Sequence, residues 1–161
     1  MANFTGANVI TTSDVTKYQP DAFEFGISTS STETTNFLLQ TTNDILRQLR
    51  IEWFPTYKTN VYTDITVLNT VEMDNTKVNL DQFERAGVYL FLGRFYLPAL
   101  TKFRPETEKD RFERMAEYYM AEYNKEFRSI LEDGVEYDST SDGTIVSSER
   151  ESLHGYRRLN R

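Results

Sequence analysis

Two stretches in the first hundred residues carry apolar side chains at helical spacing. The first follows Ser30 and Glu33, a capping-box pair, and repeats Leu and Ile until just before Pro55. The second begins at Asn79 and is apolar around nearly its whole circumference, and Pro98 is expected to kink or end it. Both patterns predict helices, and the second is typical of a helix at the centre of a bundle.

A third stretch predicts the longest helix. Pro105 suits the first turn of a helix, and an apolar stripe then continues for about five turns. Gly134 can supply the left-handed residue that ends this helix, with Val135 folding back in a Schellman arrangement. A short helix is also predicted from Thr12, stopping before Pro20. We therefore expect a mainly α protein, built as a small helical bundle.

Residues 57–73 have a different pattern. Apolar residues alternate there with Thr, Asp and Asn, and the segment is rich in residues that favour strands. We expect one or two strands, a minor β-hairpin element inserted into the helical body. The alternating residues are Val61, Ile65, Val67, Val71 and Met73.

The last part of the chain, residues 135–161, has few side chains of the kind that fill a core. It opens with acids and closes on Arg157, Arg158 and Arg161, with no acid after Glu151. Such separation of charge is unlike an ordinary solvated surface. The sequence thus predicts a helical body over residues 1–134 and an extended C-terminal arm over 135–161, which becomes ordered on a partner.

The composition of the chain excludes several classes of functional site. The 161 residues include no cysteine, which excludes disulfide frameworks, thiolate zinc sites and cysteine nucleophiles. His154 is the only histidine, and no group beside it in the sequence would make a catalytic triad or a metal site. No stretch resembles a targeting segment or could span a bilayer. We expect a soluble protein that is assembled in the cytoplasm and has no membrane contact, no catalytic activity and no cofactor.

The net charge bears on nucleic acids. A formal charge of −7 and a pI near 4.8 argue against binding to DNA or RNA, because phosphate binding needs clustered cations. An acidic wall past which DNA slides without sticking remains compatible with this charge.

One motif raises a specific chemical question. In "DSTSDGTIVSSE", residues 138–149, five residues match positions 1, 5, 6, 8 and 12 of an EF-hand calcium loop, namely Asp138, Asp142, Gly143, Ile145 and Glu149. Against that interpretation, Thr140 is a weak ligand at position 3, and no second loop exists to pair with the first. A tight Asp-Gly turn between two extended pieces explains the same residues. A small Ca²⁺-binding regulatory protein using this loop is the alternative hypothesis.

The order of features along the last third of the chain resembles the head–tail connector proteins of tailed bacteriophages, also called adaptor or head-completion proteins. A long Tyr/Phe-rich helix is followed by "GVEYDSTSDGTIVSSE" and a terminal "GYRRLNR". The residues that carry the resemblance are Tyr119, Tyr123, Gly134, Val135, Tyr137, Asp138, Asp142, Gly143, Arg158, Leu159 and Arg161.

The resemblance implies a structural virion protein of the phage neck. Such proteins form homo-oligomeric rings, commonly dodecamers, that join the portal vertex of the head to the tail and extend the DNA channel. The implied partners are other copies of the chain, the portal protein and a tail-side neck or tail-completion protein, with DNA only as cargo in the lumen. We expect the partner contacts to come from Tyr137, Asp138, Asp142, Gly143, Leu153, Tyr156, Arg157, Arg158, Leu159 and Arg161.

Overall fold

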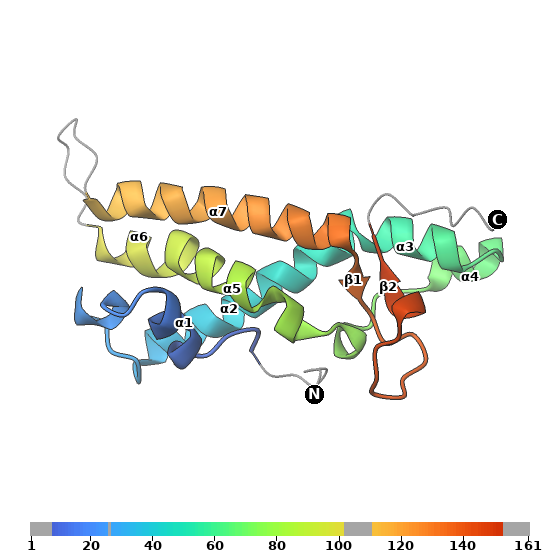
Figure 1. Cartoon of the computed structure of the whole chain (residues 1–161), viewed down its shortest axis with the longest axis horizontal. Coiled ribbons are helices and arrows are strands. Elements are labelled where there is room, and N and C mark those ends of the chain that lie inside the picture. Colours follow the sequence, from blue (N-terminus) through green and yellow to red (C-terminus); the bar gives the residue numbers. More distant parts are fainter. Residues whose placement is uncertain (1–7, 26, 102–110, 153–161) are drawn as a thin grey trace. The chain divides into compact units, whose positions relative to one another are not determined.

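The computed structural model describes residues 8–25, 27–101 and 111–152, and within these ranges the protein is mainly helical (Figure 1). The mainly α prediction is therefore confirmed. In chain order the elements are α1 (Thr12–Tyr18), η1 (Ala22–Phe25), α2 (Thr32–Glu52), α3 (Phe54–Val61), α4 (Ile65–Thr70), η2 (Asn75–Lys77), η3 (Leu80–Phe83), α5 (Glu84–Leu90), η4 (Phe91–Tyr96), α6 (Leu97–Leu100), α7 (Arg111–Asp133), β1 (Val135–Glu136), η5 (Ser147–Glu149) and β2 (Arg150–Glu151).

The chain divides into two compact units, each made of segments that are distant in sequence. We call Asn8–Asn43 with Phe83–Phe127 the helical unit, and Met1–Ala7, Asp44–Gln82 and Arg128–Arg161 the hairpin unit. The division runs through α2 and α7, which contribute residues to both units. It does not fall at residue 134, where the sequence placed the end of the body.

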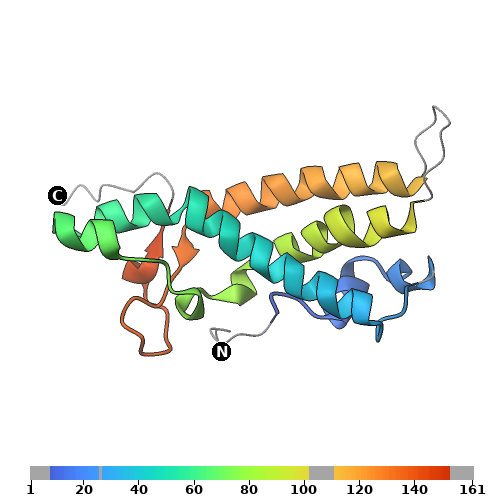
Figure 2. The same ribbon diagram turned by 180° about the vertical axis from the view of Figure 1, so that it is seen from behind.

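The apolar stretch after Asn79 forms the centre of the helical unit, as its circumference of apolar residues predicts. α5, the π-helical segment η4 and α6 follow one another and run beside α7 (Figures 1 and 2). At Gly93, inside η4, an added Cβ would lie 2.9 Å from the backbone nitrogen of Met120 in α7, so this close approach requires glycine. Pro98 lies in the first turn of α6, and the helix ends two residues later at Leu100.

Caps explain where the other helices of this unit begin. α1 starts after Thr11, whose side chain forms a capping box with Asp14. α2 is capped by Ser31, whose Oγ accepts the Thr34 backbone N–H at 3.0 Å. The sequence predicted Ser30 as the cap, one residue too early. The backbone N–H of Ser30 instead donates to the side chain of a serine two residues before it.

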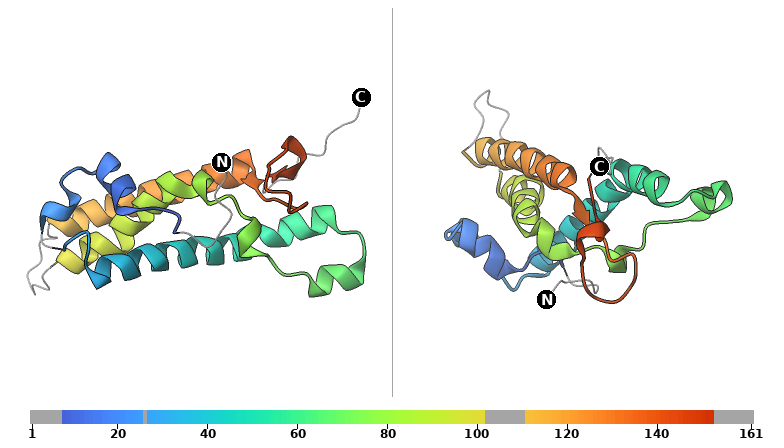
Figure 3. Two further views of the ribbon diagram at one scale, coloured as in Figure 1. Left: turned by 90° about the horizontal axis from the view of Figure 1, so that it is seen from below. Right: turned by 45° about the vertical axis from the view of Figure 1, so that its right-hand side comes forward.

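The β prediction for residues 57–73 is wrong. This segment holds most of α3 and all of α4, and it contains no strand. Pro55 lies in the first turn of α3, and Asp64 caps α4 by accepting the Thr66 backbone N–H at 2.9 Å. The Thr70 hydroxyl donates to the carbonyl oxygen of Thr66, the bond by which threonine is accommodated in helices. These local caps outweigh the β propensity of Thr and Val. Figure 3 shows α4 folded back beside α3.

Within the described residues the strands lie elsewhere, after the end of α7. β1 and β2 pair antiparallel, with Val135 opposite Glu151 and Glu136 opposite Arg150. Residues 135–152, predicted as the first part of an extended arm, therefore belong to the folded hairpin unit, and residues 153–161 lie outside the described ranges. No helix in the described part of the chain is long and apolar enough to cross a membrane.

Candidate functional site: a loop pinned by two buried carboxylates

The end of α7 fixes where the hairpin begins. Gly134 has φ +109°, and its backbone N–H donates to the carbonyl oxygen of Ile130 at 3.0 Å, which closes the helix as the sequence predicts. An added Cβ at Gly134 would lie 2.7 Å from Cγ of Arg150 on β2. The bond from Gly134 to Ile130 is that of an αL cap, and Val135, predicted to fold back in a Schellman arrangement, is the fully buried first residue of β1.

A third segment holds β1 from its other side. The backbone N–H of Asn79 donates to the Glu136 carbonyl oxygen at 3.0 Å, and the Asp138 N–H donates to the Lys77 carbonyl oxygen at 2.8 Å. Burial disfavours the charge of Glu136, but hydrogen bonds from the Asn79 amide and the Arg150 guanidinium outweigh it and lower the pKa of this carboxyl. The base of the hairpin is thus hydrogen-bonded on both edges.

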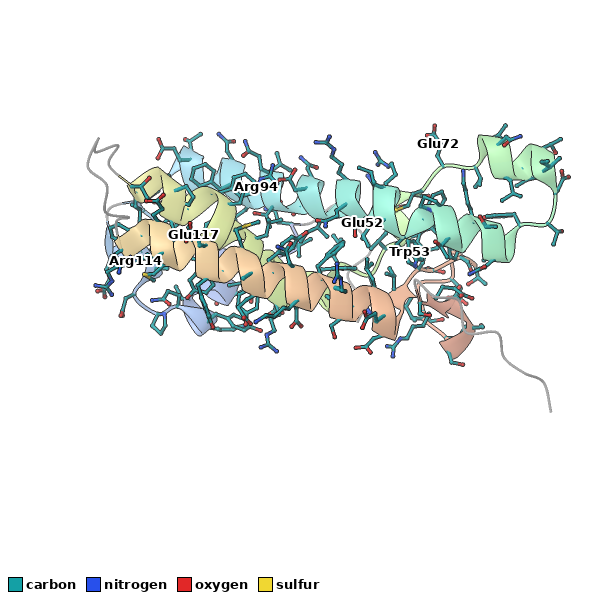
Figure 4. All side chains as sticks on the ribbon, turned by 90° about the horizontal axis from the view of Figure 1, so that it is seen from above. Glu52, Trp53, Glu72, Arg94, Arg114 and Glu117 are labelled. Carbon is teal, nitrogen blue, oxygen red and sulfur yellow. The ribbon has the colours of Figure 1, made fainter. Side chains whose placement is uncertain are left out.

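An aromatic cluster anchors the hairpin to α3. It consists of Trp53, Phe54, Tyr57 and Tyr137, whose ring centroids lie 4.8–6.5 Å apart. Trp53, labelled in Figure 4, is completely buried. Its indole N–H donates to the Glu151 carbonyl oxygen at 2.9 Å. A single side chain thus joins the start of α3 to the end of β2.

The loop between the strands is held from inside by Asp138, which is 5% exposed. Its carboxylate accepts the backbone N–H of Gly143 at 2.8 Å and that of Asp142 at 3.2 Å. The Thr140 hydroxyl donates to it at 3.3 Å. A buried carboxylate is tolerated where such donors replace its water.

Glu149, 4% exposed, holds the loop from its other end. Its carboxylate accepts the Thr140 backbone N–H at 3.0 Å, the Ser139 hydroxyl at 2.9 Å and the Val146 backbone N–H at 3.2 Å. Burial disfavours its charge, yet these donors, Thr140 foremost, lower the pKa of Glu149 overall. We call residues 139–148, which lie between these two acids, the pinned loop.

The outer side of the pinned loop is exposed from Ser139 to Thr144. Ser141 and Gly143 have positive φ angles of 60° and 79°, and no atom lies within 4 Å of where a Cβ on Gly143 would be. Asp142 accepts the backbone N–H and the hydroxyl of Thr144 at 2.8 and 2.6 Å. The loop therefore presents a fixed backbone and short polar side chains to its surroundings, and no nucleophile paired with a base.

The structure divides the predicted contact residues into three groups. Asp142 and Gly143 lie at the exposed tip of the pinned loop, where a partner can reach them. Tyr137 is only 5% exposed, and its hydroxyl accepts the Asp74 backbone N–H at 3.1 Å, so it is a core residue and not a surface contact. Asp138 is likewise buried and shapes the loop. Leu153, Tyr156, Arg157, Arg158, Leu159 and Arg161 lie outside the described residues.

Sequence analysis missed three residues that build this site. Trp53, Tyr57 and Asn79 each contact the hairpin from more than fifty positions earlier in the chain, and no local pattern signals such distant contacts. The one signal present was the type of residue, because a lone tryptophan among helix-forming residues is usually buried.

The two acids at the ends of the EF-hand spacing accept hydrogen bonds from the loop between them. Asp138 and Glu149, the residues at positions 1 and 12, are already engaged by N–H and O–H groups of the loop itself. An ion would have to displace those donors. Across residues 8–25, 27–101 and 111–152, no group of three or more His, Asp or Glu side chains is placed to hold a metal ion.

The lowered pKa of Glu149 makes the pinned loop sensitive to acid. A depressed folded-state pKa means that the stabilisation is complete above the ordinary pKa of about 4.3 and is lost as pH falls through the lower folded value. We expect the Thr140 and Val146 amide proton shifts to be constant at neutral pH and to move below about pH 4. Glu149→Gln should weaken the loop at pH 7 and remove most of this titration in NMR spectra. An unchanged titration in the variant would show that Glu149 is not its source.

No protein-family model matches the sequence, and neither a curated protein nor a solved structure matches it.

Proposed function

We propose that the chain is a structural protein of the neck of a tailed bacteriophage. Copies of it would form a ring that joins the portal vertex of the head to the tail and extends the DNA channel. The observation that carries this proposal is the pinned loop. Two buried carboxylates fix its shape from inside, while its outer side from Ser139 to Thr144 is exposed and free of catalytic pairs.

A loop whose shape is fixed by internal hydrogen bonds is better suited to binding a partner than to catalysis. Binding costs less free energy when a contact surface is already ordered, because little conformational entropy is lost on association. The hydrogen bonds of Asp138 and Glu149 supply that order here without using the outer face. A rigid, exposed hairpin loop can thus contact a neighbouring subunit in the same way in every copy of a ring.

Charge supports the same proposal. With a formal charge of −7, the chain does not attract DNA phosphates, and a channel lined by such a surface lets DNA pass without binding it. The segment after Glu151 carries Arg157, Arg158 and Arg161 and no acid. It can therefore meet an acidic surface on a portal or on another copy in a contact that weakens as salt rises.

The experiment is to locate the chain in purified particles of the phage whose genome encodes it. A tagged copy, imaged by electron cryomicroscopy, is expected to give additional density between the portal and the tail, absent from untagged particles. Density elsewhere, or a chain missing from the virion, would overturn the proposal. A calcium titration tests the alternative, because a specific site at a hundred times its Kd would stabilise the fold by about 2.7 kcal/mol.

A further inference from the structure

The hairpin unit contains two Asp-Gly pairs. We call Asp142–Gly143, in the pinned loop, the tip pair, and Asp133–Gly134, at the end of α7, the cap pair. In an Asp-Gly pair the glycine nitrogen can approach the side-chain carboxyl of the aspartate before it, because glycine has no Cβ to hinder the approach. Such pairs are therefore prone to isomerise spontaneously, and the two pairs of this chain differ in what restrains them.

The reaction rearranges the backbone without changing the composition of the protein. The glycine nitrogen loses its proton and forms a bond to Cγ of the aspartate, and one oxygen of the carboxyl group departs as water. Water then opens the resulting five-membered succinimide ring. Opening at the former main-chain carbonyl leaves the backbone running through the side-chain carbonyl carbon, which is isoaspartate, and opening at the other carbonyl restores aspartate.

Packing does not shield the tip pair. Asp142 and Gly143 are both exposed, and no atom lies within 4 Å of where a Cβ on Gly143 would be. Figure 1 shows the pinned loop extending beyond the ends of β1 and β2. Water can reach this pair, so a restraint on the reaction has to come from hydrogen bonds.

Asp138 restrains the nitrogen that would attack. The Gly143 backbone N–H donates to Oδ2 of Asp138 at 2.8 Å, and the Asp142 N–H donates to Oδ1 of the same carboxylate at 3.2 Å. An N–H that faces a carboxylate loses its proton less readily, because the nitrogen anion would lie beside a negative charge. The two bonds also fix the backbone on both sides of the Asp142 side chain.

Thr144 restrains the carboxyl group that would be attacked. Oδ1 of Asp142 accepts the Thr144 hydroxyl at 2.6 Å and the Thr144 backbone N–H at 2.8 Å, and these bonds lower the pKa of the carboxyl. The ionised carboxylate is a poor target for the nitrogen, because the oxygen that leaves needs protons to depart as water. Asp142 is thus held in its less reactive form at neutral pH.

The cap pair is restrained by the fold of the backbone. Gly134 is buried, and its N–H donates to the Ile130 carbonyl oxygen at 3.0 Å. This restraint is a helix cap and not a side chain, so substitutions at Asp138 or Thr144 leave it in place. The cap pair is therefore an internal control for the tip pair.

We propose that the tip pair is a latent isomerisation site, which remains aspartate while Asp138 and Thr144 hold it and converts to isoaspartate once those bonds are lost. Isoaspartate lengthens the backbone at the tip by a methylene carbon, so the Gly143 N–H no longer lies at Asp138 and the loop keeps a changed shape. The hydrogen bonds of the pinned loop thereby preserve the covalent structure of its outer face. This inference concerns the loop alone and does not depend on a role in a phage neck.

The test measures isoaspartate at both pairs in the full chain during incubation at neutral pH over weeks. Trypsin cuts after Arg128 and Arg150, so one peptide, residues 129–150, carries both pairs, and electron-transfer fragmentation locates isoaspartate within it. The chain unfolded in urea gives the unrestrained rate of each pair. We expect the tip pair of the native chain to isomerise at least about tenfold more slowly than that of the unfolded chain, because hydrogen bonds to a carboxylate are strong enough to change a rate by this factor.

Two variants remove the restraints separately. Asp138→Ala removes the acceptor of the Gly143 N–H and is expected to bring the tip-pair rate close to the unfolded rate, while the cap pair stays slow. Thr144→Val removes only a hydroxyl at an exposed position, so a smaller acceleration of the tip pair is expected. Ser148→Ala, at another exposed position of the pinned loop, is the matched control and should change neither rate.

Three results distinguish the proposal from its alternatives. Slower isomerisation of the tip pair in Asp138→Ala would overturn it, because Asp138 would then be the base that takes the proton from Gly143. Equal tip-pair rates in the native and unfolded chain would overturn it as well. Acceleration of both pairs in Asp138→Ala would show that the hairpin unit has opened, and Thr144→Val then decides, since an unchanged tip-pair rate in that variant rejects the proposal.

Discussion

Replacing Trp53 by alanine is expected to lower the free energy of unfolding of the hairpin unit by about 3–5 kcal/mol. The side chain is completely buried, its ring packs on Tyr57 and Tyr137 at 4.8 and 5.6 Å, and its N–H satisfies the Glu151 carbonyl oxygen. Alanine would leave a cavity and an unpaired carbonyl oxygen. Because the chain has no other tryptophan, unfolding should be followed by circular dichroism in urea instead of indole fluorescence.

Two further variants separate packing from hydrogen bonding. Trp53→Phe keeps an aromatic ring in the cluster but leaves the Glu151 carbonyl oxygen without its donor, so a smaller loss of about 1–3 kcal/mol is expected. Ile51→Ala is the surface control, because this residue of α2 is 63% exposed and should change stability by less than about 0.5 kcal/mol. A loss below about 1 kcal/mol for Trp53→Ala would contradict the placement of Trp53 in the core.

The helices with the most extensive apolar pattern could be predicted because their signal is local. The apolar stretch that includes Phe91 and Tyr96 forms a continuous helical run, and both side chains are fully buried. The sequence could not predict that the central part would be a π-helix. That geometry accompanies the close approach of Gly93 to α7, a contact between residues more than twenty positions apart.

Residues 57–73 show where the same approach fails. Their alternating Val and Thr favour strands, but a strand needs a neighbour to pair with, and none is available to this segment in the described structure. Pro55 in the first turn of α3 and the Asp64 cap of α4 act within a few residues and need no distant partner. Helical structure forms here through these short-range bonds, with little burial to support α4.

Only part of the candidate site could be predicted from the sequence. The spacing of residues 138–149 predicted a tight turn and, as the alternative, a calcium loop. In the structure Asp138 and Glu149 stand at the two ends of this segment and accept its own N–H groups. The spacing alone could not show which groups these two carboxylates would bind. The burial of Tyr137 was missed because it depends on Trp53 and Tyr57, whose distance in sequence hides their contact.

Reversing the charge at the tip of the pinned loop is expected to prevent the joining of heads to tails. Asp142 is exposed, and hydrogen bonds from the side chain and backbone of Thr144 lower the pKa of its carboxyl, so it is charged at neutral pH. If the loop docks on a partner, Asp142→Arg replaces an attraction by a repulsion, and about 1.4 kcal/mol per contact already reduces affinity tenfold. In a ring the same loss recurs in every copy, so the losses multiply and joining should fall far more than tenfold.

Mixing purified heads that lack the chain with tails and added protein, and counting joined particles by electron microscopy, measures this effect. Asp142→Asn keeps the oxygen that accepts the Thr144 N–H but removes the charge, so an intermediate loss is expected with an unchanged melting temperature. Glu132→Arg makes the same reversal at an exposed position of α7 and should join normally. Normal joining by Asp142→Arg would show that the tip of the pinned loop is not a docking surface. Failure of Glu132→Arg as well would indicate that overall charge, and not the loop, controls assembly.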